Sequence, residues 1–145
     1  MNPTSTRLLM TASAAVMAAA GIAGSFLPDE ILAGLGVARG GPSTTIMQVL
    51  ASLWLAAAMT NWMARGNAFG GIYGRPIAVG NLTHFAIGGI TLAKMVAGGG
   101  APLPLVVAAV VYTVFAAAFA VVMFSAGPVS GSPRMPTSPP LPPIR

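Results

Sequence analysis

The residue of this sequence best suited to chemistry is His84, the only histidine, which lies in a long apolar run. An ionisable residue inside a run of membrane-spanning length is a functional candidate by default. As a neutral imidazole it could hydrogen-bond Gln48, Ser52 or Asn81 and fix helix register. As an axial ligand it would hold a haem or a chlorophyll-type pigment. As a polar contact it would serve a quinone or a proton relay, and these interpretations stay open.

Large side chains recur along the last apolar run, at Tyr112, Phe115, Phe119 and Met123. Such a stripe could face a quinone, a pigment or a partner helix, and it is also typical of a face against lipid or core. Trp54, near the middle of its own run, indicates a further contact surface. The sequence requires no cofactor, but a chlorophyll-type pigment, haem or quinone is possible. The candidate cofactor-binding residues are His84, Asn81, Tyr112, Phe115 and Phe119.

Residues for catalysis are scarce. The chain has no cysteine, which excludes disulfides, thiolate metal sites and thiol catalysis. One histidine and two acidic residues cannot supply a metal cluster. Asp29 and His84 belong to opposite depths, so we expect no Ser/His/Asp arrangement. We therefore expect neither an enzyme nor a metal site.

The composition predicts an integral membrane protein. Hydrophobic residues make up 55% of the 145 residues and charged residues only 6%. Soluble domains are about 25% charged, and a surface with so few charges could not be solvated by water. The basic residues are scattered singly rather than clustered on one face, so we expect no nucleic-acid partner.

Four apolar runs predict an all-α fold, a four-transmembrane-helix bundle over residues 1–126. Each run has about 20 residues or more, enough to cross a hydrocarbon core of ~30 Å. Prolines fall at or near the starts of the runs, where a helix tolerates them. The first run has an alternative interpretation as a cleaved signal peptide, because small residues follow its apolar stretch. The predicted spans are residues 7–27, 43–64, 76–97 and 102–125.

Two segments outside the spans have their own character. Residues 28–36 predict a short interfacial helix with a proline and two acids in its first turn. Residues 127–145 contain seven prolines and predict an extended polyproline-II or disordered tail that contacts a partner. Pro140, Pro143 and Arg145 fit the PxxPxR pattern of SH3 ligands, with a tail draped over another protein as the alternative.

Charge placement predicts the orientation. With four spans, one side holds five basic residues and no acid, whereas the other holds two basic and two acidic residues. This bias places both termini in the cytoplasm of a bacterial inner membrane, where the basic face meets anionic lipids. The five basic residues are Arg7, Arg65, Arg75, Arg134 and Arg145, and the other side holds Arg39, Lys94, Asp29 and Glu30.

The segment 66–76 is a glycine-rich cytoplasmic loop. Its backbone N–H groups could cradle a phosphate or a lipid headgroup between flanking arginines. It lacks the Lys-Ser/Thr ending of a Walker loop, and a tight turn with interfacial anchors is the alternative. The predicted lipid or partner contacts here are Trp62, Arg65, Tyr73 and Arg75.

Small and polar residues recur along each span, as is typical of packed membrane helices. We expect the four stripes to converge on one axis. They are Ala14, Ala18, Gly21 and Ser25; Gln48, Ser52, Ala56 and Thr60; Asn81, His84, Gly88 and Thr91; and Ala109, Thr113, Ala117 and Ala120.

Three motifs together resemble the small bacterial membrane proteins called DoxX-like. They are Phe26-Leu27-Pro28…Ile31-Leu32…Leu35-Gly36, Asn61-Trp62…Arg65-Gly66 and Gly70-Gly71-Ile72-Tyr73-Gly74-Arg75-Pro76. The resemblance covers residues 7–125 and implies a four-helix membrane topology. The family includes a subunit associated with quinone-linked sulfur oxidation, but most members have no assigned activity, so the resemblance implies topology and not catalysis.

These observations predict a non-catalytic accessory or structural subunit of a larger bacterial inner-membrane complex, respiratory or photosynthetic. Its partners would be other membrane protein subunits and anionic lipids. One alternative is a binder of a pigment, haem or quinone near His84. A further alternative is a DoxX-like quinone- or lipid-linked membrane enzyme subunit.

Overall fold

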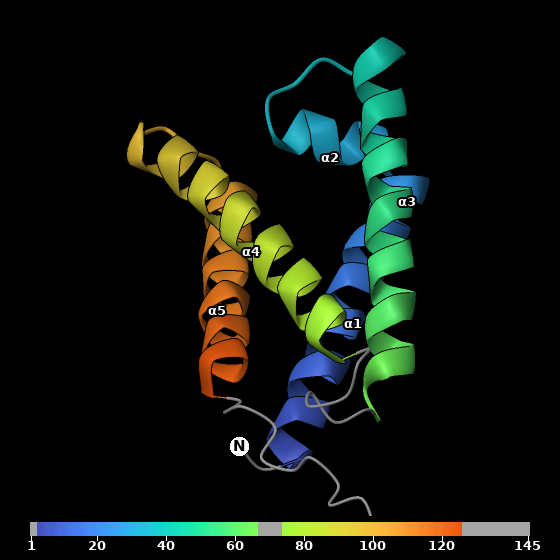
Figure 1. Cartoon of the computed structure of the whole chain (residues 1–145). Coiled ribbons are helices and arrows are strands. Elements are labelled where there is room, and N and C mark those ends of the chain that lie inside the picture. The colour runs from blue at the N-terminus through green and yellow to red at the C-terminus, as the bar shows by residue number, and fades with distance from the viewer. Residues whose placement is uncertain (1–2, 67–73, 126–145) are drawn as a thin grey trace, which may run out of the picture.

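The chain folds into five helices in the computed structural model, which describes residues 3–66 and 74–125 (Figure 1). Four of the helices are long and apolar enough to cross a membrane, which confirms the predicted all-α fold with four spans. The predicted tail, 127–145, lies outside the described residues. The helices are α1 Pro3–Phe26, α2 Pro28–Gly34, α3 Gly41–Ala64, α4 Gly74–Ala97 and α5 Leu103–Ser125.

Proline and glycine set the helix boundaries much as predicted. Pro28 and Pro42 lie in the first turns of α2 and α3, where a missing N–H costs no hydrogen bond. Gly36 and Gly40 have φ of 75° and 80°, a left-handed conformation that glycine adopts without a Cβ clash, and they flank the turn between these helices. α1 begins four residues before the predicted start, because its helix continues through polar residues beyond the apolar run.

The helices pack as two pairs. α1 packs along α3 and α4 packs along α5, whereas contacts between the pairs are few. The pairs lie close together near the N-terminal end of α1 and diverge toward the end that carries α2 (Figure 1). The start of α1, the end of α3, the start of α4 and the end of α5 lie on the same side of the molecule, as expected for consecutive antiparallel spans.

Glycines let the paired helices approach closely. A Cβ added at Gly21 of α1 would lie 2.7 Å from Cγ of Leu55 on α3. A Cβ at Gly88 of α4 would lie 2.5 Å from the ring of Tyr112 on α5. Close backbone approach at small residues is the usual way in which membrane helices gain packing energy.

The predicted packing stripe of α3 was wrong. Gln48, Ser52, Ala56 and Thr60 are all exposed, and Ala51, Ala58 and Asn61 face the core instead. The stripe of α1 was right at Ala14 and Gly21, which are buried. In α4 and α5 the stripes were right only in part, because Thr91, Thr113 and Ala117 are exposed. Four-residue spacing identifies a helix face but not the direction in which that face points.

A carboxylate ties the short helix α2 to the start of α3. Asp29 Oδ1 accepts hydrogen bonds from the Gly40 backbone N–H at 3.0 Å and from the Thr44 hydroxyl at 2.5 Å. The Thr44 and Gly40 hydrogen bonds, with the nearby Arg39 charge, hold the pKa of Asp29 below its ordinary value of 3.8. Asp29 therefore fastens the turn at the membrane surface, a role that its sequence position did not reveal.

Candidate functional site

Two asparagines join the helix pairs in the buried interior. Asn61 of α3 and Asn81 of α4 exchange two side-chain hydrogen bonds, each 2.7 Å long. Asn61 Nδ2 also donates to Ser13 Oγ of α1 at 3.1 Å, and Asn81 Nδ2 donates to the Ile77 carbonyl at 2.9 Å. Both amides therefore use their N–H donors within the protein. This pairing satisfies polar groups that lipid could not satisfy and fixes how α4 sits against α1 and α3.

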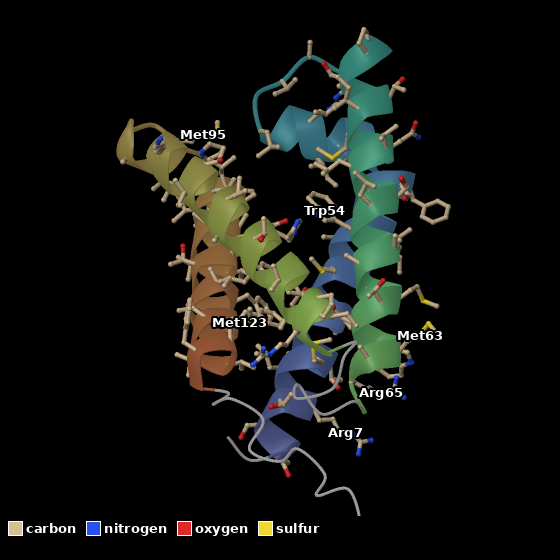
Figure 2. All side chains as sticks on the ribbon, in the orientation of Figure 1. Arg7, Trp54, Met63, Arg65, Met95 and Met123 are labelled. Atoms are coloured by element: carbon tan, nitrogen blue, oxygen red, sulfur yellow. The ribbon has the colours of Figure 1, made fainter. Side chains whose placement is uncertain are left out.

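His84 lies less than one helical turn beyond Asn81 on α4 and bonds to a tyrosine. Its Nε2 atom is 3.1 Å from the Tyr112 hydroxyl of α5. Figure 2 shows Trp54 reaching from α3 toward α4. The predicted hydrogen bond to Gln48, Ser52 or Asn81 is not made, because Tyr112 holds the imidazole instead.

The predicted aromatic stripe of α5 surrounds one residue that the sequence reading missed. Phe85 is fully buried and stacks on Phe115 and Phe119, with ring centroids 4.9 and 5.7 Å away. It also meets the rings of His84 and Tyr112 edge to face. The position of Phe85 next to the candidate histidine was the available signal. Phe115 and Phe119 therefore belong to an aromatic core that supports the His84–Tyr112 pair.

A groove of about 380 Å³ opens between α3 and α4, at the low end of the volumes typical of ligand sites. Of the candidate cofactor-binding residues, it brings together His84 and Asn81, with Tyr112 behind His84. Phe115 and Phe119 do not line it. The residues that line the groove are Met17, Ala57, Thr60, Asn61, Pro76, Ile77, Gly80, Asn81 and His84.

Of the predicted lipid contacts, the structure describes Trp62, Arg65 and Arg75. The Arg65 guanidinium lies 3.7 Å from the centre of the Trp62 ring and donates to the Trp62 carbonyl at 2.6 Å. Arg7 and Arg65 lie at the end of the molecule that holds the N-terminus (Figure 2), and Arg75 is exposed at the start of α4. The Arg65–Trp62 pair is the kind of basic and aromatic anchor found at a membrane interface. Tyr73, Pro140, Pro143 and Arg145 lie outside the described residues.

The outward side of α3 forms a second candidate site. We call it the α3 outer face: Thr45, Gln48, Ser52, Ala56, Met59 and Met63, all exposed. These residues recur at three- and four-residue spacing, which places them along one side of the helix. Figure 2 shows Met63 pointing away from the other helices. The four-residue spacing on this helix predicts a packed interior face, whereas the structure turns that face outward.

Among residues 3–66 and 74–125, no group of three or more His, Asp or Glu residues could hold a metal ion. Both sites present groups that can form hydrogen bonds with a ligand or a neighbouring protein. The groove presents one imidazole beside an apolar wall, and the α3 outer face presents hydroxyl and amide groups to its surroundings.

Comparison with protein-family models, with curated proteins and with solved structures finds no match for this chain. The described residues form five helices, four of which are candidate membrane spans, and no family is identified for the chain.

Proposed function

We propose that this protein is a non-catalytic accessory subunit of a larger bacterial inner-membrane complex, respiratory or photosynthetic. The single observation that carries the proposal is the α3 outer face. In a protein that met only lipid there, the outward residues of a spanning helix would be apolar. On α3 they include Thr45, Gln48 and Ser52.

Gln48 carries the strongest part of this argument. It lies seven residues into α3, about 10 Å along a helix of about 36 Å. Its amide is exposed and has no hydrogen-bond partner among the described residues. An amide without a partner in hydrocarbon costs several kcal/mol. A helix of another subunit that hydrogen-bonds Gln48 removes this cost.

The neighbours of Gln48 suit a close helix contact. Ser52 and Ala56 follow it at four-residue intervals, and both are small enough for a second helix backbone to approach. The Ser52 hydroxyl donates to the Val49 carbonyl at 2.7 Å, so its oxygen can still accept a hydrogen bond from a partner. The partner we propose is a transmembrane helix with a polar donor near Gln48 and Ser52.

The charges at the two ends of the molecule indicate how the protein is oriented in its membrane. Arg7 and Arg65 lie at the end that carries the N-terminus, and Arg75 belongs to the first turn of α4. The side that carries α2 has the acidic residues Asp29 and Glu30 together with the basic residues Arg39 and Lys94, so its formal charges cancel. We infer from this bias that the N- and C-termini are cytoplasmic and that the basic end contacts anionic lipids. The motifs that resemble DoxX-like proteins support a bacterial origin in the same proposal.

The groove favours a second candidate function, a binder of a small lipid-soluble molecule. A haem or chlorophyll-type pigment would bind through an unprotonated ring nitrogen of His84, and Nε2 already bonds to Tyr112, which leaves Nδ1 for such a ligand. A smaller ligand that leaves this bond in place fits the volume better. A DoxX-like quinone- or lipid-linked enzyme subunit is the remaining possibility, and it requires turnover that depends on Arg65 or Arg75.

The accessory role is tested by purifying the affinity-tagged protein from native membranes in a mild detergent. We expect the same set of membrane proteins to co-purify in fixed proportion with the unaltered chain. Ser52→Leu, on the α3 outer face, should remove them. Val114→Leu, at an exposed apolar position of α5, should not. A monomer with no fixed partner, or equal loss from both variants, contradicts the proposal.

A further inference from the structure

The groove between α3 and α4 presents a hydrogen-bonding side chain, His84, among mostly apolar residues. Its walls are mostly apolar, with Ile77, Gly80 and Pro76 along α4 and Met17 entering from α1. His84 lies at one end of this stretch and Pro76 at the other, about 12 Å apart along the helix. The groove therefore has the length of a short apolar molecule and a polar end at His84.

One ring nitrogen of His84 is available to a ligand. Nε2 faces the Tyr112 hydroxyl, but Nδ1 has no hydrogen-bond partner among the described residues. Among the described residues, every fully buried side-chain nitrogen and oxygen has a hydrogen-bond partner. Because Nδ1 has none, this atom must be accessible at the surface. The two nearby amides cannot compete with it, because Asn61 and Asn81 use their N–H groups on each other, on Ser13 and on Ile77.

The surroundings of Tyr112 indicate which nitrogen of His84 carries the proton. Among the described residues, the Tyr112 hydroxyl has no acceptor other than His84 Nε2, 3.1 Å away. The tyrosine O–H therefore donates to His84 Nε2. A neutral imidazole that accepts at Nε2 carries its proton on Nδ1. The Phe85 ring, 5.1 Å from the imidazole centroid, helps to hold this orientation. His84 thus offers an N–H donor beside the groove.

The depth of His84 in the membrane limits which ligand groups can accept a hydrogen bond from it. It lies ten residues into α4, about 15 Å along a helix of about 36 Å. This is near the middle of the hydrocarbon core, and the ester carbonyls of phospholipids lie in the interfacial regions outside that core. A ligand that accepts from Nδ1–H must therefore carry its acceptor oxygen into the hydrocarbon itself.

We propose that this groove binds a membrane-soluble carbonyl compound. The carbonyl oxygen accepts a hydrogen bond from His84 Nδ1–H, and the apolar body lies along Gly80 and Ile77 toward Pro76. The same chemistry is found in the ring of a lipid-soluble quinone and in an aliphatic ketone. The proposal is independent of the docking role of α3, because Gln48 and Ser52 do not line the groove.

The test uses nitrogen NMR of the full chain labelled with ¹⁵N-histidine, in detergent micelles. Because His84 is the only histidine, the spectrum reports one imidazole. We expect the Nδ1-protonated tautomer without ligand. Decylubiquinone or 2-tridecanone should then shift the Nδ1 resonance in a saturable way, and n-tridecane, which has no carbonyl, should not.

A variant at Gly80 separates groove binding from dissolution of the probe in the micelle. A Cβ at Gly80 would meet nothing within 4 Å, so Gly80→Leu fills the groove without a clash at its first carbon. This variant should keep the tautomer and lose the shift. A shift with decylubiquinone alone assigns the site to quinone rings, and a shift with both probes assigns it to carbonyls in general. The Nε2-protonated tautomer, or no saturable shift with either probe on the unaltered chain, overturns the proposal.

Discussion

The outward sides of α3 and α5 are built from different residues, although both helices are long enough to cross the membrane. On α5 one side is lined by apolar residues, most of them large, and the exposed Thr113 at its edge donates its hydroxyl to the Ala109 carbonyl of the same helix. On α3 the corresponding side carries hydroxyl and amide groups as well as methionines. We call the first set the α5 outer face: Leu103, Val107, Val110, Val114, Ala117, Val121 and Phe124.

The difference teaches which helix is suited to lipid. Acyl chains solvate valine and leucine well, so nothing on the α5 outer face requires a protein neighbour. The α3 outer face has an amide at Gln48, and lipid cannot hydrogen-bond it. Exposure in an isolated chain therefore means lipid contact for one helix and, in our proposal, subunit contact for the other.

The largest effect should follow from adding bulk to the α3 outer face. Ala56→Trp would push a partner helix away, and overpacking of this kind costs about 1–3 kcal/mol. That cost weakens the association by about fivefold to 150-fold. Quantitative mass spectrometry of the purified complex measures the loss. Val114→Trp on α5 is the matched control, and equal losses from both changes would erase the distinction between the faces.

The next effect compares the contributions of two α3 amides to stability: Asn61, which faces the interior, and Gln48, which faces outward. Asn61→Leu leaves the amide of Asn81 buried without its partner, which should lower the free energy of unfolding by about 1–3 kcal/mol. Gln48→Leu should not lower it, because Gln48 bonds to no described residue. SDS titration of the purified chain, followed by circular dichroism, measures both. A loss of stability in Gln48→Leu as large as that in Asn61→Leu would mean that Gln48 has an internal partner.

A smaller effect tests the packing of α5 against α4, which turns the α5 outer face away from the other helices. Gly88→Ala places a Cβ 2.5 Å from the Tyr112 ring, so the ring must move and strain its bond to His84. We expect a loss of about 1 kcal/mol in the free energy of unfolding. Gly80→Ala, on the same helix with open space around its Cβ, should gain about 0.5–1 kcal/mol. The same titration compares them, and the reverse order would contradict the tight α4–α5 contact.

The smallest effect concerns the turn before α3. The hydrogen bonds from Thr44 and Gly40 lower the pKa of Asp29 in the folded protein, so they stabilise the fold when the carboxylate is ionised. This contribution is present above the ordinary value of 3.8 and is lost as the pH falls through the lowered folded pKa. The thermal midpoint of Asp29→Asn should therefore fall less than that of the unaltered chain as the pH drops from 5 toward about 2. Parallel curves would show that the Asp29 contacts contribute nothing.

Much of the fold could be predicted because hydrophobic length and proline position are local properties. The runs fixed four helices, and Pro28 with its two acids marked α2. The direction of each helix face could not be predicted in the same way. The stripe at Gln48 and Ser52 has the same spacing as the buried stripe of α1, and only the tertiary packing of α3 on α1 separates them.

Two residues of the groove could be identified from the sequence, but their contacts could not be predicted. His84 and Asn81 were identified from their polarity within an apolar run, and both line the groove. Their partners lie on other helices: Tyr112 is 28 residues from His84, and Asn61 is 20 residues from Asn81. Such pairings depend on how α4 crosses its neighbours, which the spacing along one helix does not encode.

The most direct test of the central claim is photo-crosslinking in native membranes. Benzoylphenylalanine replaces Ser52 or Ala56 on the α3 outer face, and Val110 or Val114 on the α5 outer face. The account predicts that both α3 positions crosslink to one and the same membrane protein and that both α5 positions give only lipid adducts. Lipid adducts alone from α3, or an adduct of two copies of this chain, would contradict it.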